Sequence, residues 1–160
     1  MTLEEFKIID PAALPIGKLI MMAARGYSIY LNRHLNDLNI NTTQLHLLFE
    51  IAHQKDINQD KIASRCNINK SAVARSIRKL EEKGLVERKI DENNRRQNIV
   101  SLTYKGKETL NECMRRMDEW EREIYHDFDI IDEETFKKAL KELVIRTIEL
   151  NQKGDSNDKK

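Results

Sequence analysis

A change of hydrophobic period at Gly84 constrains the fold of this 160-residue chain more than any other feature. The run INKSAVARSIRKLEEKG, which ends at this glycine, places Val73, Ile77 and Leu80 on one side of a helix, because successive residues rotate by about 100°. The residues that follow, LVERKI and QNIVSL, are β-branched runs separated by the polar tip DENNRR. We therefore predict a helix that leads directly into a β-hairpin.

Polar residues that begin and end helices predict two further helices before this one. Thr42 is a good N-cap for the first, and Asn58 for the second. Asn67 tolerates the left-handed conformation that ends helices, and Asn69 can cap the next helix. The inward residues should be Leu45, Leu48, Phe49, Ala52, Ile62, Ala63 and Cys66. Three helices, a short CNIN turn and a hairpin predict a winged helix-turn-helix over residues 41–103.

Longer helices are predicted on both sides of this lobe. One should run from Pro11 to about Asn36, and Thr103 and Asp132 should each cap a later helix. The polar segment 151–160 is predicted to be disordered. The expected fold is mainly α with a small β-hairpin wing.

The outer face of the helix before Gly84 is basic and carries short side chains. Ser71, Arg75, Arg78 and Lys79 fall roughly 140° to 240° away from the apolar stripe. Short side chains near the start of the helix would let its backbone approach base edges, and Arg75 is long enough to bind a guanine with two hydrogen bonds. The alternative is an ordinary solvated helix with ion pairs between successive turns.

Charge is distributed unevenly in a chain whose net charge is +1. Residues 55–107 contain 14 Lys or Arg and 7 Asp or Glu, whereas residues 108–150 contain 7 and 13. A basic middle segment is typical of a surface that binds a polyanion. The predicted hairpin tip adds Arg95 and Arg96, which suit a narrow minor groove, although charged hairpins also serve to block edge pairing.

The segment from TTQLHLLFEIA through NKSAVARSIRKLEEKGLVER to VSLTYKG resembles the MarR family of transcription regulators (multiple antibiotic resistance regulators). The resemblance covers about residues 14–150. It implies a homodimer whose recognition helices bind the major grooves of a pseudo-palindromic operator and whose wings contact minor grooves. One departure is Asn94, which stands where the family has an Asp beside the wing arginine.

The resemblance also implies which residues contact double-stranded DNA. The first two residues of one helix would contact the phosphate backbone, as would a residue at the start of the next helix. The recognition helix and the wing would supply the remaining contacts. The implied set is Thr42, Thr43, Gln59, Lys70, Ser71, Ala72, Arg75, Ser76, Arg95 and Arg96, and the outward face of the recognition helix adds Lys79.

The helices outside the lobe, residues 11–40 and 104–150, are expected to form the dimer, since the lobe alone is too small to bury their apolar stripes. Six apolar residues of the later helices are candidates for the dimer interface, with packing in the intrachain core as the alternative: Trp120, Met117, Ile124, Phe136, Leu140 and Leu143. Many family members bind small aromatic acids or phenols between the dimer helices and the lobe. A pocket of that kind could be lined by Met21, Met22, Tyr27, Tyr30 and His34, for each of which core packing is the alternative.

Other classes of protein find little support in the sequence. There is no nucleophile-elbow motif, Gly-rich phosphate loop or zinc-ligand spacing, so we expect no enzyme, no cofactor and no metal site. Cys66 and Cys113, 47 positions apart, favour core packing over redox sensing. Neither a signal peptide nor a membrane span is visible, which favours a cytoplasmic location.

We therefore expect a cytoplasmic, homodimeric DNA-binding transcription regulator, a repressor released by a small effector. The competing interpretation is a winged-helix protein–protein interaction module that does not bind DNA.

Overall fold

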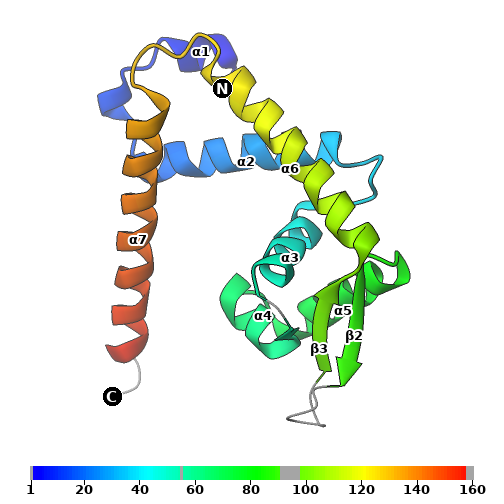
Figure 1. Cartoon of the computed structure of the whole chain (residues 1–160). Coiled ribbons are helices and arrows are strands. Elements are labelled where there is room, and N and C mark those ends of the chain that lie inside the picture. Colours follow the sequence, from blue (N-terminus) through cyan, green and yellow to red (C-terminus); the bar gives the residue numbers. More distant parts are fainter. Residues whose placement is uncertain (1, 55, 91–97, 158–160) are drawn as a thin grey trace. The chain divides into compact units, whose positions relative to one another are not determined.

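The computed structural model describes residues 2–54, 56–90 and 98–157 (Figure 1). The predicted wing residues Arg95 and Arg96 lie outside these ranges. The helices are α1 Leu3–Lys7, α2 Ile16–His34, α3 Thr42–His53, α4 Gln59–Cys66, α5 Lys70–Glu82, α6 Tyr104–Tyr125 and α7 Glu133–Asn157, with a 3₁₀ turn at Pro11–Ala13. The strands are β1 Ile57–Asn58, β2 Val86–Ile90 and β3 Asn98–Leu102. The mainly α fold with a small β-wing is thus confirmed.

The chain forms two compact units, Met1–Met117 and Asp118–Lys160. The first unit contains the helix-turn-helix and the wing. No helix among the described residues has both the length and the apolar character needed to cross a membrane.

The core of the first unit lies where α3, α4 and α5 pack against one another and against the sheet (Figure 1). Val73, Ile77 and Leu80 have no exposed surface, as the helical spacing predicts. Burial of side chains of this size stabilises a fold by roughly 1.5–3 kcal/mol each. In α3 the prediction was partly wrong, because Leu47 is fully buried and Ala52 is exposed.

The sheet has three antiparallel strands in the order β1-β3-β2, one more than the predicted hairpin. Ile57 pairs with Val100 in register, and Val100 also pairs with Arg88 of β2. Strand β1 has only two residues, too few for an alternating pattern to reveal it in the sequence. Its pairing with β3 joins the segment directly before α4 to the wing.

The predicted helix ends are confirmed around the recognition helix. Asn58 Oδ1 accepts a 2.8 Å hydrogen bond from Lys61 N, and Asn69 Oδ1 accepts one of the same length from Ser71 N. Asn67 and Gly84 have positive φ angles of 51° and 70°. The amide of the residue after Gly84 reaches back to the last turn of α5, which fixes where that helix stops.

Two other predicted helix starts were wrong. Asn41, not Thr42, caps α3: its Oδ1 accepts from Gln44 N at 2.9 Å, and the Gln44 side chain returns a hydrogen bond to Asn41 N. Asn41 has Gln44 three positions later and can form this reciprocal cap. Thr42 has Leu45 at the same distance, and a leucine side chain cannot return the hydrogen bond. The long first helix begins at Ile16 rather than Pro11, since Pro15 is its N-cap.

The second unit holds the end of α6 and all of α7. Asp132 caps α7, as predicted, through a 2.8 Å hydrogen bond from Thr135 N. Phe136 is half-buried and lies near the rings of Tyr125 and Phe128. Helix α7 continues past Leu150 to Asn157, so the segment 151–160, predicted to be disordered, begins within this helix.

Candidate nucleic-acid interface

The outer face of α5 is exposed, with its polar residues pointing away from the core. Ser71, Arg75 and Lys79 are exposed, while Ala72 and Ser76 are half-buried beside the stripe. The capping Asn69 fixes the position where the helix starts. A helix with a buried apolar stripe and an open basic face has the geometry that major-groove recognition requires.

A chain of hydrogen bonds orients Arg75 along this face. Ser71 Oγ donates to Asn69 Oδ1 at 2.7 Å, and Arg75 Nη1 donates to Ser71 Oγ at 3.4 Å. The Ser71 hydroxyl is therefore turned so that its oxygen accepts from the guanidinium. The hydrogen-bond partner of Arg75 on this face is thus a neutral hydroxyl rather than a carboxylate.

The other cations of the face differ in their partners. Lys70 Nζ lies 3.1 Å from Asp60 Oδ1 of α4, and Arg78 Nε lies 3.0 Å from Glu82 Oε1 one turn along α5. Within the described residues, neither Arg75 nor Lys79 forms an ion pair. These two cations are the ones most available to a polyanion.

The residues of α3 and α4 that were predicted to contact phosphate differ in how exposed they are. Thr43 is exposed and Thr42 is half-buried, with the Thr42 amide 3.4 Å from Asn32 Oδ1. The Nε2 atom of Gln59 is buried and has no hydrogen-bond partner among the residues that the structure describes.

The C-terminal end of α5 is anchored by a residue that the sequence did not single out. Lys83 Nζ donates to Asn39 O and, at 3.1 Å, to Gln44 Oε1. Partial burial, with a smaller contribution from Lys79, lowers the pKa of Lys83. Together with asparagines of α2 and the following turn, Lys79 and Lys83 line a polar cavity of about 450 Å³.

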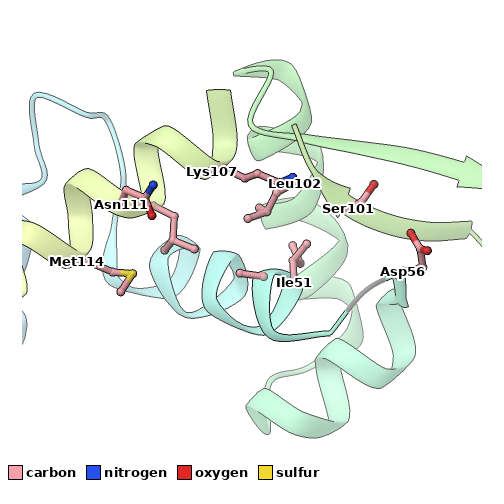
Figure 2. A pocket seen from close by; sticks show the side chains of 9 residues that line it. Ile51, Asp56, Ser101, Leu102, Lys107, Asn111 and Met114 are labelled. Carbon is pink, nitrogen blue, oxygen red and sulfur yellow. The ribbon is translucent and has the colours of Figure 1, made fainter. Parts of the chain in front are cut away.

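A second cavity, of about 680 Å³, lies between α3, β3 and the first turns of α6 (Figure 2). Figure 2 shows Met114 at one end and Asp56 at the other, with Lys107 and Asn111 projecting from α6.

None of the five residues predicted to line a pocket borders this cavity. Met21 is 74% exposed, and Tyr27 and Tyr30 pack against the core. His34 stacks on Tyr30 at 3.8 Å between ring centroids.

The two cysteines and the histidines form no metal or redox centre in the part of the chain that the structure covers. Cys113 is fully buried, and desolvation raises its pKa to about 11. Cys66 is partly buried against the core, and its pKa is also raised, first by desolvation and then by Glu50. Raised pKa values disfavour the reactive thiolate at neutral pH.

Comparison with known proteins gives the same architecture. A model of the MarR family matches residues 40–97. The Bacillus subtilis protein YybA, described as an uncharacterized HTH-type transcriptional regulator, is 29% identical over 143 residues, covering 87% of this chain and 95% of YybA. YdgJ of the same organism, with the same description, is 29% identical over 85 residues, which cover 53% of this chain and about half (52%) of YdgJ.

Solved structures extend the similarity over most of the chain. A crystal structure of MarR has a TM-score of 0.81 and 28% identity, covering 91% of this chain and 98% of that one. A cysteine-to-serine mutant of MarR from E. coli, complexed with operator DNA, has a TM-score of 0.70 and 25% identity, covering 84% and 99%. The winged helix, the family match over residues 40–97 and these neighbours together show that the chain is similar to transcription regulators of the MarR family over most of its length.

Proposed function

We propose that this protein is a sequence-specific double-stranded DNA-binding regulator that acts as a homodimeric repressor. The observation that carries the proposal is the exposed Arg75, held by Ser71 on the outer face of a capped helix whose opposite side is fully buried. The operator complex of the E. coli MarR mutant supports the same use of the fold. Ser71, Ala72, Arg75 and Ser76 would face bases, and Lys70 and Lys79 would contact bases or phosphates.

Exposed apolar faces support a dimer. On α2, Ile16, Ile20, Met21, Met22 and Ile29 are between 38% and 74% exposed. On α7, Leu140, Val144 and Ile148 follow at four-residue steps and are 42%, 54% and 51% exposed. Stripes of this kind mark surfaces that bury against a partner, and twofold symmetry is the commonest solution. It would set two recognition helices about 34–36 Å apart or at a multiple of that spacing.

Release by a small molecule is the remaining part of the proposal. The 680 Å³ cavity in Figure 2 has a suitable size for an effector. It is bordered by α6, and Thr103, the residue before α6, donates a 2.7 Å hydrogen bond to the carbonyl of Gly84 just after the recognition helix. An occupant that moved α6 would therefore shift α5, and a shift of a few ångströms misplaces a reading helix.

Salt dependence tests whether DNA binding is the function. The affinity for a random-sequence duplex should fall steeply between about 50 and 200 mM salt, with a log–log slope near −0.9 per phosphate contact. A protein–protein interaction module would show weak binding with little salt dependence. Absence of measurable duplex binding at the lowest salt would favour that second function.

A further inference from the structure

The start of the recognition helix carries an ion pair that the DNA-binding role does not call for. Lys70 is the first residue of α5, and its ammonium lies 3.1 Å from the carboxylate of Asp60. Asp60 belongs to a different helix, α4. Both side chains are exposed, 74% for Lys70 and 63% for Asp60, so the pair forms on the surface that we assign to DNA.

We propose that Asp60 limits the affinity of this surface for DNA by holding the Lys70 ammonium, a role that rests on the proposed DNA-binding function. A phosphate that approaches Lys70 competes with the carboxylate for the three N–H donors of the ammonium. The contact with the phosphate is therefore weaker than it would be to an ammonium without a carboxylate partner. The displaced carboxylate also stays beside the polyanion, where charges within about 8 Å still interact at physiological salt.

The local structure keeps Asp60 in place. It is the second residue of α4, one position after the helix begins, where the exposed amide groups favour a negative side chain. Asn58 caps the same turn through its 2.8 Å hydrogen bond with Lys61 N. The carboxylate is thus presented by a fixed helix end rather than by a loop.

Asp60 pairs with a different end of the recognition helix than Glu82 does. Glu82 pairs with Arg78 one turn away, near the C-terminal end of α5. Asp60 instead neutralises a cation at the N-terminal end, which is the end that enters the groove in helix-turn-helix proteins. Its effect should therefore fall on the contacts nearest to the DNA.

A purely structural role for the pair predicts the opposite sign. If Asp60 served only to join the starts of α4 and α5, its removal would loosen Lys70 and weaken DNA binding. If Asp60 restrains Lys70, its removal strengthens binding. The direction of the change separates the two.

The test is the affinity of full-length Asp60→Asn for a random duplex at about 50 mM salt. We expect binding roughly 3- to 5-fold tighter than wild type, the upper part of the range that an exposed ion pair can supply, and a smaller gain at about 200 mM salt. Asp129→Asn is the matched control, because it removes the same charge from an exposed position between α6 and α7. It should change the affinity by less than about 1.5-fold.

The Lys70→Gln protein tests whether Asp60 acts through Lys70. In Lys70→Gln, the Asp60→Asn substitution should give a gain below about 2-fold, because the ammonium that Asp60 held is gone. Equal gains in both backgrounds, unchanged or weaker binding by Asp60→Asn, or an equal gain by the control would each overturn the inference while wild type still bound DNA. Failure of wild type itself to bind would instead overturn the proposed function.

Discussion

Replacing Gly106 with alanine is expected to lower the midpoint of thermal unfolding by at least about 6 °C. A Cβ atom at this position would lie 1.9 Å from the carbonyl oxygen of Leu85 and 2.9 Å from its carbonyl carbon. Both are backbone atoms, so no side-chain rotation relieves the overlap. Overpacking costs typically about 1–3 kcal/mol, and a backbone clash this close should lie at the upper end of that range. About 1 kcal/mol moves the midpoint by roughly 2–4 °C in a chain of this size, so about 3 kcal/mol lowers it by about 6 °C or more.

The overlap would arise where Gly106, in the first turn of α6, lies against Leu85, which follows the recognition helix. Thr103 Oγ1 donates to Gly84 O at 2.7 Å and accepts from Gly106 N at 3.0 Å. Thr103 N also donates to Leu85 O at 3.1 Å. A displaced α6 would therefore carry the end of α5 with it, and we expect weaker DNA binding at temperatures where the variant is still folded.

The control for this variant is Gly17→Ala. A Cβ atom at Gly17 would meet nothing within 4 Å, so its midpoint should stay within about 2 °C of wild type. Circular dichroism melts of the three proteins give the comparison. If the Gly106 variant melted together with the Gly17 control, the close approach of α6 to Leu85 would be disproved.

Arg116→Ala should destabilise the first unit by about 1.5–3 kcal/mol, the range for hydrogen bonds to charged groups. The Arg116 side chain is only 16% exposed and joins α6 to the end of α2. Its guanidinium donates to Asp37 Oδ1 at 2.5 Å and Oδ2 at 2.8 Å, to Glu112 Oε1 at 2.8 Å, and to His34 O. Arg115→Ala is the matched control: Arg115 also pairs with Glu112 but is 54% exposed, so its loss should cost less than about 1 kcal/mol.

Arg116→Ala should also change how the free energy of unfolding depends on pH. Hydrogen bonding to Arg116 lowers the pKa of Asp37 from 3.8 to about 2, and hydrogen bonds from Arg115 and Arg116 lower that of Glu112 from 4.5 to about 2. Because these pKa values are depressed in the folded state, the stability they confer is present above about pH 4.5 and is lost as the pH falls toward 2.

Urea unfolding at about pH 6 and about pH 3 measures this effect. Wild type should lose more stability between the two than Arg116→Ala, in which the pKa of Asp37 returns toward its ordinary value. Equal losses in the two proteins would show that the Asp37–Arg116 ion pair does not form in solution.

Local patterns predicted the recognition helix well because their causes are local. The stripe of Val73, Ile77 and Leu80 and the ends at Asn69 and Gly84 depend on helical spacing, capping and a left-handed glycine. The face of α5 that points outward followed directly from that stripe. These features need no knowledge of the rest of the chain.

Contacts between distant segments could not be predicted in this way. Arg116 binds Asp37 across 79 positions, and Lys83 binds Gln44 across 39. The pairing of Asp60 with Lys70 also depends on how α4 and α5 pack. Strand β1 was missed because two residues show no period, and α1, a five-residue helix capped by Thr2, was missed for the same reason. A sequence pattern reports which way a side chain faces but not which partner it meets.

The central claim is that the outward face of α5 reads DNA sequence through Arg75, and the most direct test compares a duplex selected for binding with a scrambled duplex of equal length. Arg75→Ala should lose roughly 10- to 100-fold in affinity for the selected duplex and change little on the scrambled one, because one bidentate base contact discriminates by about 1–3 kcal/mol. Arg122→Ala, an exposed arginine of α6, should bind both duplexes like wild type. If Arg75→Ala kept the wild-type preference for the selected duplex, the assignment of this face to sequence recognition would be wrong.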